Sequence, residues 1–67
     1  MGNNIKKLRK EFGINQAELA RKLGFSRSYM NILENNVKQP NSATALRIAN
    51  ILGCTLNDIF FEKDGNL

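Results

Sequence analysis

The stretch NQAELARKLGFSRSYMNILENN, residues 15–36, decides the fold predicted for this chain. It holds two helical patterns, each preceded by a polar residue that can cap a helix, and Gly24 separates them. The apolar residues keep to one face of each helix: Leu19, Ala20 and Leu23 in the first, Met30 and Leu33 in the second. Helices joined by a turn of about three residues cross steeply and touch near the bend. We therefore predict a packed helix pair over residues 16–35.

Helical spacing continues on both sides of this pair. Residues 5–12 carry Ile5, Leu8 and Phe12 at helical intervals, after Asn3 or Asn4 as a cap and before Gly13. A fourth helix is predicted from Asn41 or Ser42 to Gly53, with an apolar stripe of Ala45, Ile48, Ala49 and Leu52. A short fifth helix is predicted over residues 55–60, where Asp58 can answer the cap at Thr55. The prediction is an all-α domain of five helices over residues 1–67, and its tail, residues 61–67, either frays or forms a strand in a dimer.

The totals place the chain among small ordered globules. A length of 67 residues suits one domain, and no apolar run approaches the roughly 18 residues that cross a bilayer. No long apolar segment marks a secretory signal at the N-terminus, and the single cysteine cannot form an internal disulfide. We expect a cytoplasmic protein away from membranes in which Cys54 serves as a small core residue.

Positive charge gathers in the first two thirds of the chain. Nine of the ten Lys and Arg residues and three of the six acidic residues lie in residues 1–47, which therefore carry a net charge of +6. Residues 48–67 carry the remaining −2 of the formal net charge of +4. This asymmetry suits an anionic partner such as nucleic acid, although a basic surface can also serve solubility alone.

Residues 15–36 resemble the helix-turn-helix of the lambda and 434 repressor and Cro family (XRE type) of bacterial and phage regulators. The similarity extends from Ile5 to Phe60, through IKKLRKEFG (5–13) before the motif and ALRIANILGCTLNDIF (45–60) after it. It implies a lambda-repressor-like domain of five helices whose third helix enters the DNA major groove. Asn36 departs from the pattern, because many relatives carry Gly there.

The outer side of the third helix holds the predicted base contacts: Arg27, Ser28, Asn31 and Ile32. The resemblance assigns Arg27, Ser28 and Ile32 to positions that face base edges. The Arg27 guanidinium matches the two acceptors of guanine, a contact worth about 1–3 kcal/mol of discrimination, but it would also suit a phosphate. Asn31 can pair with adenine or remain an exposed helix residue, and Ile32 can meet a thymine methyl group or belong to the edge of the core.

Phosphate contacts are predicted around the third helix. The starts of the second and fourth helices offer free amides and a positive dipole end, and the loop before Pro40 adds a cation. The resemblance implies that the Gln16 side chain binds a phosphate. The Tyr29 ring can pack inward while its hydroxyl reaches a second phosphate. The predicted set is Asn15, Gln16, Tyr29, Asn35, Lys38, Gln39, Asn41, Ser42 and Thr44.

Two charged residues fall on apolar stripes. Arg9 lies on the inward side of the first helix, and Glu34 lies beside Met30 and Leu33 on the third. A buried charge needs a partner, so we predict a structural ion pair between Arg9 and Glu34. Similar positions in the family hold such a pair.

A homodimer on double-stranded DNA is expected, because one recognition helix reads only a few base pairs. Phe60 and Phe61 are adjacent and cannot both face one core. The predicted dimer interface consists of Leu56, Ile59, Phe60 and Phe61, and burial of these side chains within the monomer is the alternative.

These features predict a sequence-specific transcriptional regulator, a repressor that binds a roughly palindromic operator. The alternative is a protein-interaction module, such as the antitoxin half of a toxin-antitoxin pair, whose apolar C-terminal patch binds another chain. The sequence contains no His, no paired Cys and no phosphate-binding loop. We therefore expect neither catalysis, nor a metal, a cofactor or a small-molecule ligand.

Overall fold

The structure is a computed structural model that describes residues 2–60, and the regular structure in this range is entirely helical. The predicted order of five helices is confirmed. The tail, residues 61–67, for which either fraying or a strand is predicted, lies outside the described residues. The helices are α1 (Ile5–Phe12), α2 (Gln16–Leu23), α3 (Arg27–Glu34), α4 (Ser42–Leu52) and α5 (Leu56–Phe60).

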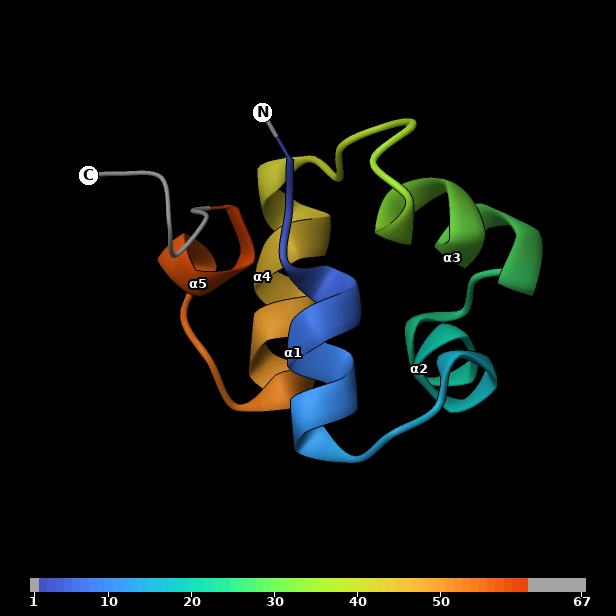
Figure 1. Cartoon of the computed structure of the whole chain (residues 1–67), viewed down its shortest axis with the longest axis horizontal. Coiled ribbons are helices and arrows are strands. Elements are labelled where there is room, and N and C mark those ends of the chain that lie inside the picture. The colour runs from blue at the N-terminus through green and yellow to red at the C-terminus, as the bar shows by residue number, and fades with distance from the viewer. Residues whose placement is uncertain (1, 61–67) are drawn as a thin grey trace.

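Helices α1 and α4 run side by side through the middle of the molecule, and α5 packs against α4 (Figure 1). Helices α2 and α3 lie on the other side of α1. Figure 1 looks nearly along the axis of α2 while α3 runs across the picture, so the two helices cross steeply as predicted. This arrangement leaves one flank of α3 facing away from the other helices. Within residues 2–60, no helix is long and apolar enough to span a bilayer.

Side-chain caps fix where most helices begin. Asn15, Ser26 and Asn41 each accept a hydrogen bond from the backbone N–H three residues later, at 2.8, 3.1 and 2.8 Å. Each such cap contributes about 1 kcal/mol. At the start of α5, the Thr55 hydroxyl accepts from the Asp58 N–H at 3.2 Å and the Asp58 carboxylate accepts from the Thr55 N–H at 3.1 Å. This reciprocal capping box confirms the roles predicted for these residues.

Asn3 and Asn4 have different roles at the start of α1. Asn4 holds the cap position, but the bond to the helix comes from Asn3, whose Oδ1 accepts from the Ile5 N–H at 3.1 Å. Asn4 instead binds α5: its N–H donates to the Ile59 carbonyl at 2.8 Å and its Nδ2 to the Asp58 carbonyl at 3.0 Å. The N-terminus is thereby tied to α5.

Four helices end in the same motif, in which an N–H donates to the carbonyl five residues earlier. At α3 the residue that reverses the chain is Asn36, with φ of 63°, a left-handed angle that Asn tolerates better than most residues. The N–H to carbonyl bonds are Ile14 to Arg9, Phe25 to Ala20, Val37 to Ile32 and Cys54 to Ala49, at 3.3, 2.9, 3.1 and 2.9 Å.

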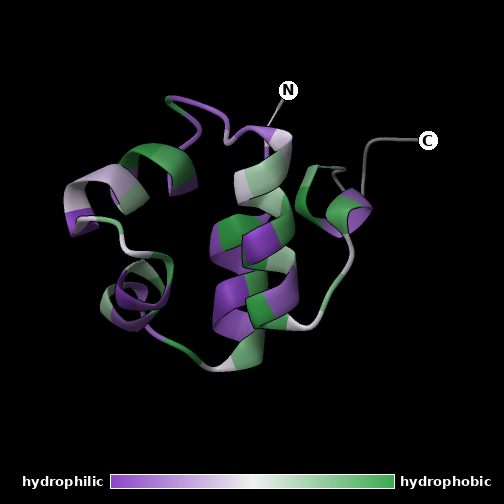
Figure 2. Ribbon diagram, turned by 180° about the vertical axis from the view of Figure 1, so that it is seen from behind, coloured by the Kyte–Doolittle hydropathy of each residue, from purple (hydrophilic) through white to green (hydrophobic). Residues whose placement is uncertain are grey.

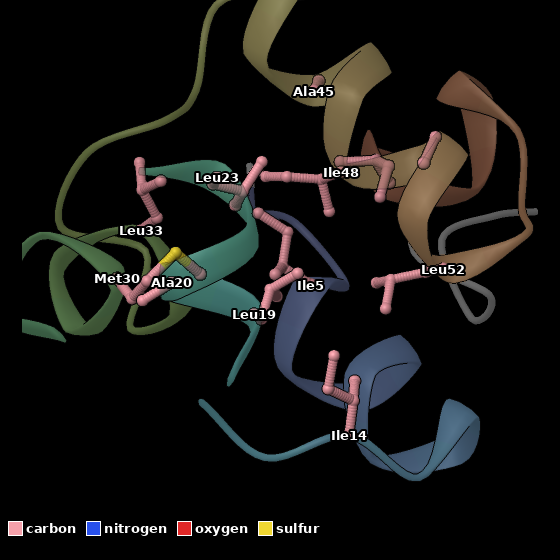
Figure 3. Packing of buried hydrophobic residues seen from close by; sticks show 12 residues of the cluster. Ile5, Ile14, Leu19, Ala20, Leu23, Met30, Leu33, Ala45, Ile48 and Leu52 are labelled. Carbon is pink, nitrogen blue, oxygen red and sulfur yellow. The ribbon is translucent and has the colours of Figure 1, made fainter. Parts of the chain in front are cut away.

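The core lies where α1, α2, α3 and α4 meet, and every stripe predicted for α2, α3 and α4 is buried. Figure 3 shows Ile5, Leu23 and Ile48 converging from three helices, with Leu19 beside Ile5. Close approach of α2 and α3 is possible because Ala20 is small. The buried apolar residues are Ile5, Ile14, Leu19, Ala20, Leu23, Met30, Leu33, Ala45, Ile48, Ala49, Leu52 and Ile59.

Phe12 departs from the predicted stripe of α1, because 55% of its surface is exposed. It is the last residue of the helix, and Ile14, two residues later, is buried at that end of the core. Ile14 therefore takes the place that the spacing of α1 assigns to Phe12.

The assignment of Ile59 to a dimer interface is wrong, because its side chain is fully buried within the monomer. The backbone bond from Asn4 holds α5 against the N-terminus, and this turns Ile59 inward. Leu56 and Phe60 are half-buried and pack against the core, so only part of each could meet a partner. Phe61 lies outside the described residues.

Cys54 follows α4 and is half-buried against the core, in line with its predicted packing role. The pKa of the Cys54 thiol is raised. Burial is the larger cause, and the negative charge of the nearby Asp58 carboxylate is the smaller one. A raised thiol pKa lowers the thiolate fraction at neutral pH.

Candidate nucleic-acid interface

The outer flank of α3 carries polar and charged side chains that the described chain leaves uncovered. Met30 and Leu33 are fully buried on the inner flank. The predicted base-contact residues are all on the other side of the helix. Exposed there are Arg27, Ser28, Asn31, Ile32 and Asn35. The exposure predicted for this flank is thus confirmed, and its contacts with DNA stay a prediction.

Aromatic packing supports the start of α3. The ring of Phe25, in the turn before the helix, meets the ring of Tyr29 edge to face, with 5.0 Å between centroids. Both side chains are half-buried and pack on the core. Together with the Ser26 cap, this contact fixes the end of α3 from which Arg27 and Ser28 project.

The predicted ion pair between Arg9 and Glu34 is present and buried. Arg9 Nε donates to Glu34 Oε2 at 2.7 Å and Arg9 Nη2 donates to Glu34 Oε1 at 3.2 Å, the two-pronged geometry that suits a guanidinium and a carboxylate. Arg9 Nη1 also donates to the Ile14 carbonyl at 3.0 Å. The pair therefore ties α1 to the C-terminal turn of α3.

Gln16 links α2 to the exposed flank of α3. Its Nε2 donates to Asn31 Oδ1 at 2.7 Å and to Glu34 Oε1 at 3.4 Å. The structure thus brings together a residue predicted to bind phosphate and one predicted to contact a base. The bond orients the Asn31 amide before any partner arrives.

The start of α4 and the preceding loop contain the other predicted phosphate contacts. Asn41 and Ser42 are exposed and Thr44 is half-buried, while Lys38 is exposed on the loop. The side chain of Asn41 is used as the helix cap, so anion binding there would rely on backbone amides. Asn15 has the same cap role at the start of α2.

Gln39, one of the predicted phosphate contacts, has a structural role as well, because both ends of its amide bind within the protein. Its Oε1 accepts from Asn3 Nδ2 at 3.0 Å, and its Nε2 donates to Asn36 Oδ1 at 3.3 Å. The half-buried side chain thus secures the loop. Its amide nitrogen carries two hydrogens, so the contact with a phosphate stays a prediction.

Comparison with known proteins identifies the family. A family model described as a helix-turn-helix domain matches residues 2–65. The chain belongs to this helix-turn-helix family. The resemblance to repressor and Cro-type regulators is thereby confirmed.

Relatives of this helix-turn-helix domain include phage and bacterial proteins. The chain is 40% identical over 57 residues to the ImmF control region 10 kDa protein of Bacillus phage phi105, covering 85% of this chain and 63% of that protein. It is 34% identical over 65 residues to the HTH-type transcriptional regulator SinR of Bacillus licheniformis, covering 96% of this chain and 59% of SinR. The chain thus spans less than two thirds of the length of either relative.

The fold is also similar to that of a solved protein–DNA complex. The crystal structure of SinR, the master regulator for biofilm formation, in complex with DNA matches 79% of this chain and 86% of the SinR chain. The TM-score is 0.70 and the sequence identity is 31%.

The helix-turn-helix domain contains a cluster of side-chain amides that the sequence did not predict, in which Asn3 is buried, Gln39 half-buried and Asn36 exposed. Asn3 lies just before α1. Its backbone N–H donates to Asn36 Oδ1 at 2.7 Å, and its Nδ2 donates to the Leu33 carbonyl at 2.9 Å. With Gln39 these side chains form a cluster of three amides that fastens the turn after α3. The sequence offered only a weak signal, an Asn pair before a helix, and nothing in it pointed to a partner more than 30 residues away.

Proposed function

We propose that this chain is a DNA-binding transcriptional regulator that inserts α3 into the major groove. The observation that carries the proposal is the outer flank of α3, exposed from Arg27 to Asn35 on a helix whose other flank is fully buried. Membership of the helix-turn-helix family and the likeness to SinR solved on DNA support it. An α-helix fits the major groove of B-DNA, where each base pair has a distinct pattern of donors and acceptors.

Each exposed side chain of α3 has a chemistry that suits a base edge. Arg27 offers paired donors to guanine, and Asn31, held by Gln16, offers its amide to adenine. Ile32 offers an apolar surface to the methyl group of thymine. Ser28 can donate to or accept from any base and so contributes little discrimination.

Phosphates would be bound on both sides of α3. The starts of α2 and α4 present backbone amides at positive dipole ends, and Lys38 adds a cation between α3 and α4. Such contacts position a protein on DNA without specifying sequence.

A second copy of the chain would complete the operator complex. Two chains related by a two-fold axis would place their α3 helices in half-sites about 34 Å apart. Within the described residues, the exposed parts of Leu56 and Phe60, at α5, are what remains available of the predicted interface. Occupancy of such an operator would repress transcription in the cytoplasm.

Selection from a random duplex library tests the proposal. We expect one roughly palindromic sequence to be enriched, with an affinity about 1,000-fold or more above that for random duplex at physiological salt. Binding to random duplex should weaken steeply as salt rises. A chain that binds all duplexes equally at every salt concentration would contradict the proposal.

A further inference from the structure

The ending of α3 differs from the endings of α1, α2 and α4 in how exposed its apolar residues are. In this type of ending, the residue that follows the left-handed position usually packs against the residue five positions earlier. After α1, α2 and α4 the residue in question is Ile14, Phe25 or Cys54, and each is buried or half-buried against the core. After α3 it is Val37, with 77% of its surface exposed.

The partner of Val37 in this motif is Ile32, which is also exposed, at 38%. The Val37 N–H donates to the Ile32 carbonyl at 3.1 Å, and the Asn36 N–H donates to the Leu33 carbonyl at 3.3 Å. These bonds fold the chain back at the end of α3 and bring Val37 close to Ile32. We name the two side chains the apolar ridge.

The ridge interrupts a polar surface. Figure 2 shows the loop between α3 and α4 in hydrophilic colours apart from one short hydrophobic segment. Asn31, Asn35 and Lys38 are exposed around the ridge along the chain. Packing within the motif does not account for the ridge, since most of the Val37 surface stays uncovered.

Hydrogen bonds to the Asn36 side chain fix the turn that precedes Val37. Asn36 Oδ1, on the preceding residue, accepts from the Asn3 N–H at 2.7 Å and from Gln39 Nε2 at 3.3 Å. These bonds fix the turn on the inner side while Val37 projects outward. A preorganised apolar contact loses little conformational freedom when a partner binds.

We propose that Val37, together with Ile32, reads thymine methyl groups in the major groove and so determines part of the DNA specificity. This inference rests on the proposed function, because the ridge adjoins the flank of α3 assigned to base contacts. In the major groove the 5-methyl group of thymine is the apolar group on a base edge. A ridge of two aliphatic side chains amid polar ones is complementary to such methyl groups.

Replacing thymine by deoxyuridine tests the inference, because it removes one methyl group and keeps the base pair. In the operator selected for the wild-type chain, each thymine is replaced in turn and affinity is measured. We expect a loss of roughly fourfold at one or more positions, the effect of uncovering about one methyl-sized group. The Val37→Ala variant should bind the thymine and deoxyuridine forms equally at one of these positions.

Leu46→Ala is the matched control, because Leu46 is an aliphatic residue on a different helix, α4, with 51% of its surface exposed. This variant should keep the full methyl sensitivity of the wild type. Both variants should melt at the wild-type temperature, since both residues are exposed. Sedimentation without DNA should give the same mass for Val37→Ala and the wild type.

The outcomes separate the inference from the proposed function. The inference is overturned, and the proposed function stands, if the wild type binds a specific operator but loses no affinity on any thymine-to-deoxyuridine replacement. The same holds if Val37→Ala loses as much affinity as the wild type at every such position. A change of mass in Val37→Ala would assign the ridge to contacts between chains and also overturns it. A wild-type chain without sequence preference overturns both.

Discussion

Glu34 is the residue at which three helices meet. Its carboxylate accepts from Arg9 on α1 and from Gln16 on α2, and it lies in the last turn of α3 with a nearly inaccessible side chain. The arrangement holds the inner flank of α3 while the outer flank stays bare. Loss of this carboxylate would leave the buried Arg9 without its charge partner.

Replacing Glu34 by Ala is therefore expected to lower the free energy of unfolding by about 3–5 kcal/mol. The Glu18→Ala variant is the control, because Glu18 forms an exposed pair with Arg21 at 3.6 Å. Exposed pairs contribute at most about 1 kcal/mol. Denaturant unfolding of both variants measures the difference, and equal stability of Glu34→Ala and the wild type would contradict a structural role for the pair.

Arg27 and Gln16 should differ in how their loss affects DNA binding. Arg27→Ala is expected to remove about 1–3 kcal/mol of discrimination at one base pair and to leave the preferences elsewhere intact. Gln16→Ala should weaken binding to all sequences, and it should also relax one further position, because Gln16 orients the Asn31 amide. Affinities for all single-base variants of the selected operator measure both effects. Uniform losses in both variants would refute this division.

At the scale of the helices, the amide cluster behind α3 is the feature most open to test. Asn3→Ala removes the donor to the Leu33 carbonyl and the acceptor for the Ile5 N–H. Because buried groups without partners are costly, we expect a loss of about 2 kcal/mol in stability. Asn50→Ala, at an exposed site on α4, should change stability little. Thermal unfolding measures the difference. Equal melting temperatures for Asn3→Ala and Asn50→Ala would contradict a stabilising role for the cluster.

The helices themselves were predictable because their signals are local. Asn15, Ser26 and Asn41 cap through the amide three residues away, and the apolar stripes repeat every three or four residues. The exposed flank of α3 followed from the same spacing. The Arg9–Glu34 pair could be predicted because a charge on an apolar stripe demands a partner.

What local patterns did not reveal depends on contacts between distant segments. Ile59 and Phe12 have similar spacing signals, yet the bond between Asn4 and Ile59 turns one inward while the end of α1 leaves the other exposed. The engagement of Gln39 by Asn3 and the link between Gln16 and Asn31 likewise join residues 15 or more positions apart. Val37 is apolar like Ile14, Phe25 and Cys54, which hold the same position after α1, α2 and α4, and its exposure appears only in the folded chain.

At the scale of the whole molecule, a two-fold complex makes a prediction about spacing. Two α3 helices in successive major grooves require half-sites on one face of the duplex. Inserting five base pairs between the half-sites should therefore lower affinity, on the order of 100-fold, because the second chain loses its linked contact. Gel-shift titration measures this, together with the number of chains bound. One chain for each operator and no dependence on spacing would contradict the dimer.

The account as a whole depends on the outer flank of α3 entering the major groove. Intermolecular nuclear Overhauser effects in a complex of the isotope-labelled chain with its selected duplex measure this contact directly. The account predicts contacts from the side chains of Arg27, Asn31 and Ile32 to cytosine H5 and thymine methyl protons, which line the major groove. Contacts confined to minor-groove protons, or contacts from other surfaces while α3 shows none, would contradict it.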